Sequence, residues 1–236
     1  MRLTWLGHAT VLLEIGGARL LTDPVLRMRV AHLRRHMPEP VDPRPVDGIL
    51  MSHVHGDHLD RPSLRRFPGV AALAPVGAAE LMRDQEVREV RAGDRVDFAG
   101  VSVLVVEAWH EARRRPGTKV IDSLGFVMER VWFAGDTDLH DDMEALRGHV
   151  DVALLPVWGW GPSLGPGHMD PQRAAQAVAL VAPEIAIPIH WGTFLPYGSR
   201  RKDLLVSPPV QFSAKAAELA PSTRVEVLSP GGSISL

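Results

Sequence analysis

Short apolar runs, each the length of a β-strand, recur along most of the chain between turn signals. Leu3–Leu6, Thr10–Ile15 and Arg19–Thr22 come first, and Gly16-Gly17 between the last two indicates a hairpin. Helical composition is clear in fewer segments, above all in the alanine-rich stretch Pro171–Val181. Such a chain can bury its apolar surface by packing sheets together and covering them with helices. We therefore expect an α/β fold of two β-sheets packed face to face, with helices outside.

Strands and helices mix throughout the chain. The 236 residues suit a single domain, 1–236, with pseudo-halves of approximately 1–122 and 123–236. The stretch Val25–Asp47 has little periodicity and is expected to be a long surface loop with at most one short helix. Further strands are predicted at Gly48–Ser52, Val101–Ala108, Leu124–Glu129, Val131–Ala134, Val152–Val157, Ile185–Ile189 and Arg224–Leu228, and further helices at Val76–Asp84, Asp142–Arg147 and Pro208–Leu219.

The composition excludes several kinds of protein. The chain has no cysteine, so thiolate zinc sites, disulfides and a cysteine nucleophile are all excluded. A formal net charge of −2 does not suggest nucleic-acid binding. No apolar run approaches the roughly 18 residues of a membrane span, and the N-terminus lacks a signal-peptide pattern. We expect a cytoplasmic protein without stable membrane anchoring.

Ligand-type side chains are concentrated in His53-Val54-His55-Gly56-Asp57-His58, directly after a predicted buried strand. Residues 53 and 55 lie on one side of an extended segment, because side chains alternate along a strand. Gly56 allows a sharp turn, after which Asp57 and His58 can face the same cavity. A chance cluster of surface histidines is the alternative, but four such residues in six positions favour a metal site.

Three more candidates each follow an apolar, strand-like run: His110, Asp136 and His190. A single histidine after a strand is more often structural. Together with the cluster, however, these residues could complete two sites, because each catalytic zinc takes about three protein ligands and a water. The chain is therefore expected to hold two divalent metal ions, with Zn²⁺ preferred and Mn²⁺ or Fe²⁺ as alternatives.

The order His53-x-His55-x-Asp57-His58, His110, Asp136, His190 resembles the metal motifs of the metallo-β-lactamase superfamily over nearly the whole chain. The resemblance implies a four-layer αβ/βα sandwich of two mixed β-sheets flanked by helices. It also implies that His53, His55 and His110 hold the first metal, that Asp57, His58 and His190 hold the second, and that Asp136 bridges them. Asp23 matches an early aspartate of the family that supports a metal histidine.

Four secondary motifs resemble one branch of that superfamily, which contains N-acylphosphatidylethanolamine phospholipase D and the ascorbate phosphate lactonase. These motifs are Gly7-His8-Ala9-Thr10, Thr22-Asp23-Pro24, Gly135-Asp136-Thr137 and His168-Met169-Asp170-Pro171. His55 stands where redox diiron members have glutamate, which favours zinc hydrolysis over oxygen chemistry.

Several residues have both a functional and a structural interpretation. His168 could contact substrate or protonate a leaving group, or could simply pack at a helix entry. His8 lies either near the metals or in the core. His32, His36, His140 and His149 are expected at the solvated surface. Candidate substrate contacts are Arg113, Arg114 and Arg115, which could attract an anion, and Trp158, Trp160 and Trp191, which could wall a pocket.

The leading functional hypothesis is a dinuclear zinc hydrolase whose metal-bridging hydroxide attacks a phosphodiester or other phosphate-containing ester. Asp57 would orient the nucleophile. One alternative is a lactonase acting on a sugar phosphate. An alternative of another class is a metal-binding sensor or scaffold without turnover. The expected partner is a small anionic molecule, with no nucleic acid, and homo-oligomers are compatible with the sequence.

Overall fold

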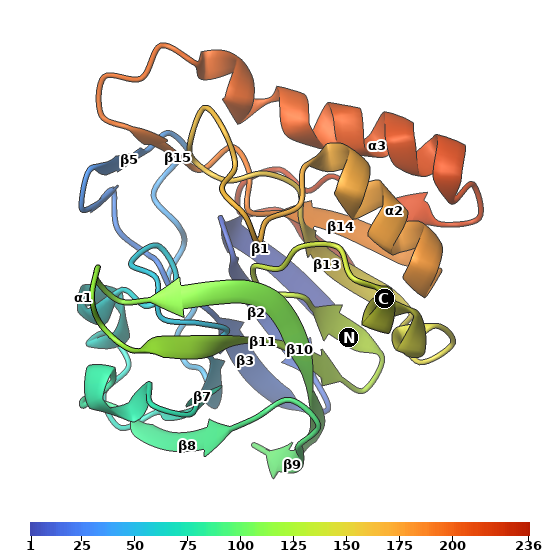
Figure 1. The fold of residues 1–236 in the computed structure, drawn as a ribbon. Coiled ribbons are helices and arrows are strands. Elements are labelled where there is room, and N and C mark those ends of the chain that lie inside the picture. The colour runs from blue at the N-terminus through green and yellow to red at the C-terminus, as the bar shows by residue number, and fades with distance from the viewer.

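The computed structural model describes residues 1–236, and two seven-stranded β-sheets form its centre (Figure 1). The first sheet has the order β17-β1-β2-β3-β6-β7-β8. Its strands are β1 (Arg2–Gly7), β2 (Thr10–Ile15), β3 (Ala18–Thr22), β6 (Gly48–Leu50), β7 (Ala71–Pro75), β8 (Glu86–Val90) and β17 (Ser233–Ser235). β17, β1, β2 and β3 pair antiparallel, whereas β3, β6, β7 and β8 pair parallel, so the sheet is mixed.

The second sheet has the order β16-β14-β13-β12-β11-β10-β9. Its strands are β9 (Arg95–Phe98), β10 (Val101–Arg113), β11 (Val120–Met128), β12 (Val131–Phe133), β13 (Val152–Pro156), β14 (Ile185–Ile189) and β16 (Arg224–Val225). β9 to β12 pair antiparallel, and β12, β13, β14 and β16 pair parallel. Both sheets are therefore mixed.

Two apolar cores define the layers. The larger core joins the facing sides of the two sheets, where Leu3 and Val11 of the first meet Val103 and Leu154 of the second. A smaller core covers the other side of the first sheet, beneath α1 (Arg61–Leu64) and the short 3-10 helix η1 (Ala79–Leu81). The other helices are η2 (Asp141–Leu146), α2 (Pro171–Val181), η3 (Lys202–Leu205) and α3 (Ser207–Leu219). Figure 1 shows α2 and α3 outside the second sheet, so the predicted sandwich is confirmed.

Helix α2 sets the position of the loop that precedes it. Asp170 caps its N-terminus by accepting a hydrogen bond from Arg173 N at 2.8 Å, and Pro171 occupies the first turn. The helix ends at Val181, and the residue that follows, Ala182, caps it with a left-handed φ of 51°. Its alanine-rich side packs into the larger core. The loop ending at Asp170 is thus held beside the edge of the second sheet.

Local structure departs from the sequence predictions in two loops. Within Val25–Asp47, where at most a helix was predicted, the chain forms a hairpin of β4 (Arg29–Val30) and β5 (Leu33–Arg35), which pairs with β15 (Phe194–Pro196). The predicted helix Val76–Asp84 is wrong, because only the single turn η1 forms there. Gly77, with a φ of 97°, breaks the helical path at the start of the segment.

The boundary between the sheets does not follow the middle of the sequence. β9 and β10 belong to the second sheet, although they precede residue 122, and C-terminal β17 pairs with β1, with Leu3 opposite Ile234. β10 runs to Arg113, beyond the predicted end at Ala108. None of the helices combines the length and apolar composition needed to cross a bilayer; the longest, α3, has 13 residues.

Candidate metal centre

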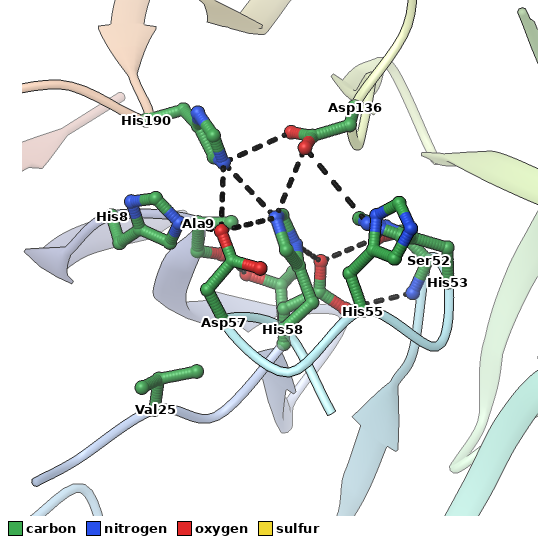
Figure 2. A network of polar contacts seen from close by, with 12 residues as sticks. His8, Ala9, Val25, Ser52, His53, His55, Asp57, His58, Asp136 and His190 are labelled. Carbon is green, nitrogen blue, oxygen red and sulfur yellow. Dashed lines mark hydrogen bonds and ion pairs between the residues drawn. The ribbon is translucent and has the colours of Figure 1, made fainter. Parts of the chain in front are cut away.

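The predicted ligands lie close together. Figure 2 shows His53, His55, Asp57, His58, Asp136 and His190 facing a common centre. Candidate residues follow the carboxyl ends of β6, β12 and β14, and His110 lies in the last part of β10, three residues before its end at Arg113. In β10 the pairing with β11 shifts register between Ala108 and Ala112, and such a bulge re-aims the side chain of His110. Gly135, with a φ of 65°, turns the chain after β12, and a Cβ there would lie 2.8 Å from Leu124 O. That turn brings Asp136 to the centre.

One group of donor atoms contains His58, His190, Asp57 and His8. The Nε2 atoms of His58 and His190 lie 3.0 Å apart, and Asp57 Oδ2 lies 3.9 and 4.0 Å from them. His8 Nε2 donates a hydrogen bond to Asp57 Oδ2 at 3.0 Å. Three of these side chains are buried and Asp57 is nearly so.

A second group contains His53, His55 and His110. His110 Nε2 lies 3.0 Å from His55 Nδ1. Asp136 lies between the two groups: its Oδ2 is 3.9 Å from His53 Nε2 and 3.2 Å from His58 Nε2, and its Oδ1 is 3.2 Å from His190 Nε2. Figure 2 shows this carboxylate reaching toward His190 on one side and His53 on the other.

The unsatisfied atoms of the centre fit bound cations. His53 Nε2 and Asp136 Oδ1 are buried without a hydrogen-bond partner. A buried polar atom left unpaired costs about 1–3 kcal/mol, which a coordinated cation would offset. Imidazole nitrogens and carboxylate oxygens are the donors that zinc takes in cysteine-free sites. The residues present therefore fit divalent metal ions, and the individual ligand roles remain predictions.

The electrostatics favour ionised carboxylates and, at His53, His110 and His190, neutral imidazoles. At His58 burial opposes protonation, but the neighbouring Asp136 and Asp23 raise its pKa well above the ordinary value. Burial lowers the pKa of His53 well below its ordinary value, that of His110 to about 4 and that of His190 to about 3. Burial alone would raise the pKa of Asp136, but the neighbouring His190 and His58 hold it well below the usual range. Neutral imidazole and charged carboxylate are the forms that bind metal.

The second ring nitrogen of four histidines is fixed by an acceptor. His58 Nδ1 donates to Asp23 Oδ2 at 2.7 Å. His110 Nδ1 donates to Gly167 O at 2.9 Å, and His190 Nδ1 donates to Trp158 O at 2.7 Å. The Ser52 hydroxyl donates to Asp23 and accepts from His53 Nδ1. These bonds turn each Nε2 toward the centre. No residue type in the sequence marks the two backbone acceptors, Gly167 O and Trp158 O.

The backbone itself is constrained at the centre. His8, Asp23 and His190 all have positive φ, at 52°, 32° and 62°. Such conformations are costly for non-glycine residues and cluster at functional sites. His190 N donates to His8 O at 2.9 Å, so a backbone hydrogen bond links two of these residues. His8 is buried beside His190, with ring centroids 3.8 Å apart, and is thus part of the centre.

A cavity of about 330 Å³ opens onto the donors. His168 lies in its wall, with Nε2 3.5 Å from Asp136 Oδ2. Burial opposes protonation of His168, but its bond to Asp136 outweighs burial and raises the pKa. The full lining is Val30, Ala31, His32, Leu33, His55, Gly56, Asp57, Asp136, Trp160 and His168.

The three arginines do not line this cavity. Arg114 is half-buried, and its Nη1 donates to Val54 O and Leu59 O at 3.1 and 2.7 Å. Arg113 Nη1 donates to Thr118 O within the β10–β11 connection, and Arg115 is exposed there. Their side chains brace the loops or face solvent in this structure, so contact with substrate remains only a prediction.

The three tryptophans predicted to wall a pocket, Trp158, Trp160 and Trp191, have different surroundings. Trp160 lines the cavity, and its Nε1 donates to Asp57 Oδ2 at 2.9 Å. Trp158 Nε1 donates to Gly161 O, whereas Trp191 is buried against Trp5 at a centroid distance of 5.0 Å. Among the histidines expected at the surface, His140 is instead 6% exposed and stacks on Trp109, so that expectation is wrong. His32 is exposed but forms part of the cavity wall.

A two-sheet sandwich with a histidine–aspartate centre at one edge defines the class of protein. The chain belongs to the beta-lactamase superfamily domain family, whose model matches residues 18–191. It is 34% identical to a UPF0173 metal-dependent hydrolase of Methanopyrus kandleri over 99% of both chains, and 31% identical to one of Pelotomaculum thermopropionicum over 100% of both. Its fold resembles Igni18, a metallo hydrolase of Ignicoccus hospitalis, with a TM-score of 0.75 and 22% identity over 99% of this chain and 97% of that one.

Proposed function

We propose that this chain is a hydrolase that works with two divalent metal ions, and that both are Zn²⁺. The observation behind the proposal is the place of Asp136, whose carboxylate lies between the two donor groups, 3.2 Å from His58 Nε2 and 3.9 Å from His53 Nε2. The names of the relatives from Methanopyrus kandleri and Pelotomaculum thermopropionicum, both metal-dependent hydrolases, support the same class.

The proposed ligand assignment follows the two groups. His53, His55 and His110 would hold one ion, Asp57, His58 and His190 the other, and Asp136 would bridge them. Neutral nitrogen and carboxylate oxygen donors without thiolate suit Zn²⁺, with Mn²⁺ or Fe²⁺ as the alternatives. When bound, such a pair of ions lowers the pKa of water toward neutrality and polarises the bond under attack.

The chain's own residues would orient the reactants. Asp57 Oδ2 is held by His8 and Trp160, which fixes the carboxylate facing the centre, where it can orient a nucleophilic water. His168 enters from the loop before α2 and reaches into the same cavity. We infer that its imidazole donates a proton to the leaving oxygen.

The cavity favours a carbonyl substrate. Its lining has no lysine or arginine side chain, and Val30, Leu33 and Trp160 make part of the wall apolar. A neutral ester or lactone therefore suits the cavity better than a phosphodiester, for which recognition would fall on the metals and His168. The branch suggested by the secondary motifs, with its phospholipase and lactonase, stays a prediction. A phosphate-containing ester is accordingly the second candidate.

Hydrolysis of matched substrates tests the proposal. Zinc-loaded protein would be assayed with p-nitrophenyl butyrate, γ-butyrolactone and bis(p-nitrophenyl) phosphate, beside an Asp136→Asn variant. We expect turnover of the ester or lactone by the wild type and its loss in the variant. Two bound metal equivalents without turnover of any of the three would favour the sensor or scaffold instead.

A further inference from the structure

Trp160 joins the substrate cavity to the proposed catalytic carboxylate. The residue lies in the loop after β13, and its ring forms part of the cavity wall. Its Nε1 donates to Asp57 Oδ2 at 2.9 Å, the same oxygen that accepts from His8 Nε2 at 3.0 Å. Two donors on one oxygen leave the Asp57 carboxylate little freedom to rotate.

The opposite side of Trp160 is held by the β4–β5 hairpin. His32 at the hairpin tip packs edge-on against the indole, with ring centroids 5.0 Å apart and an interplanar angle of 81°. Trp160 also packs against a small apolar cluster of Val25, Val30, Leu33 and Phe194. Two segments distant in the sequence thus make one continuous apolar wall beside the donors.

The shape and chemistry of this wall restrict what can bind. At about 330 Å³, the cavity is at the small end of ligand pockets. Its apolar residues, Val30, Ala31, Leu33 and Trp160, come from the hairpin and the Trp160 loop. Its polar groups belong to the donor side, except for His32 at the hairpin tip. A substrate with its reactive bond at the donors would therefore place an adjacent apolar group against Trp160.

We propose that Trp160 has two tasks: its ring receives the apolar substituent of a small, uncharged ester or lactone, and its N–H positions Asp57. The proposal rests on the proposed hydrolase function for its substrate, but the link between Trp160 and Asp57 stands on geometry alone. Occupancy of the wall and alignment of the carboxylate then depend on the same side chain.

Two substitutions separate these tasks. Trp160→Phe keeps an aromatic ring but removes the donor, and Trp160→Ala removes both. Trp109→Phe is the matched control, because this indole lies next to His110 in sequence but stacks on His140, outside the cavity. Leu33→Ala shortens the hairpin side of the wall without touching Asp57.

Kinetics with two esters would show which task is lost. Trp160→Phe should lower kcat for p-nitrophenyl butyrate by roughly 10–100-fold, as for other outer hydrogen-bond partners of a metal ligand, with little change in KM. Trp160→Ala and Leu33→Ala should raise KM for the butyrate by roughly tenfold, but not for the acetate, which lacks the apolar extension. Trp109→Phe should match the wild type. Unchanged KM in both alanine variants would overturn the apolar-wall assignment.

Zinc titration provides a readout that is independent of turnover. Calorimetric titration of metal-free protein should show weaker binding of one Zn²⁺ in Trp160→Phe than in the wild type, by roughly 10–100-fold. If the wild type hydrolyses none of the esters, the proposed function fails while this comparison still tests Trp160. Equal zinc affinities, with folded protein by circular dichroism, would refute its positioning role.

Discussion

The Nε2 atoms of His58 and His190 face each other at 3.0 Å. The Nδ1 atom of each ring already donates, to Asp23 and to Trp158 O. In their neutral forms the two rings therefore point lone pairs at the same place, an arrangement that a shared cation satisfies and that two hydrogen-bond acceptors cannot satisfy by themselves.

Metal content is the first prediction. Protein reconstituted with zinc should carry two ions per chain by elemental analysis, because two donor groups share Asp136. Free zinc at 100 times its Kd should stabilise the fold by about 2.7 kcal/mol, raising Tm by roughly 5–10 °C over chelator-treated protein. A single ion at full occupancy, or an unchanged Tm, would contradict the dinuclear assignment.

Replacing Asp136 should abolish function without unfolding the chain. In Asp136→Asn the amide offers one neutral oxygen where the carboxylate offers two charged ones. We expect kcat to fall by more than roughly 100-fold, beyond the usual effect of a residue outside the ligand set, with a chelated-state Tm close to wild type. Wild-type turnover at saturating zinc would remove Asp136 from the centre.

Asp23 should act more mildly, because it acts on the metals only indirectly, through His58 and, by way of Ser52, through His53. Asp23→Ala removes the acceptor that orients His58 Nδ1. Zinc affinity or kcat should fall by roughly 10–100-fold. Competition with a calibrated chelator would measure the change; an effect as large as that of Asp136→Asn would point to direct ligation instead.

A glycine pair in one loop offers a matched steric test. A Cβ on Gly167 would lie 2.8 Å from His110 Nδ1, and the φ of 78° is unfavourable for alanine. A Cβ on Gly165 would meet nothing within 4 Å. Gly167→Ala should displace His110 and weaken zinc binding, whereas Gly165→Ala should not. Similar zinc titrations for the two variants would show that His110 does not depend on this loop.

Arg113 and Arg115 should differ from Arg114 in the effect of their substitution. Arg113→Gln with Arg115→Gln should leave KM for an anionic ester within about twofold and independent of added salt, because neither side chain lines the cavity. Arg114→Gln should instead destabilise the fold by about 1.5–3 kcal/mol, since its guanidinium binds two backbone carbonyls. If the double variant had a higher KM than the wild type for the anionic ester, and if this difference changed with salt, an anionic substrate bound by these arginines would again be supported.

The sequence by itself was enough to predict most of the strands and to identify the candidate metal ligands. β2, β14 and α2 have the predicted bounds, because apolar patterning reports local burial directly. The cluster from His53 to His58 and the later candidates His110, Asp136 and His190 lie close together in the structure. Their roles as metal ligands stay predictions.

Only the tertiary structure decided which surfaces meet. β17, near the C-terminus, pairs with β1 at the N-terminus, and the hairpin at His32 packs against Trp160. No local sequence feature of these segments predicts which segment each one contacts. The acceptors Gly167 O and Trp158 O are backbone atoms. Every residue has such a carbonyl, so the residue type at these positions could not predict the hydrogen bonds. His140 lies in a polar stretch yet is buried under Trp109. Periodicity shows that a side chain is covered, but contact with a distant loop depends on how the layers close over it.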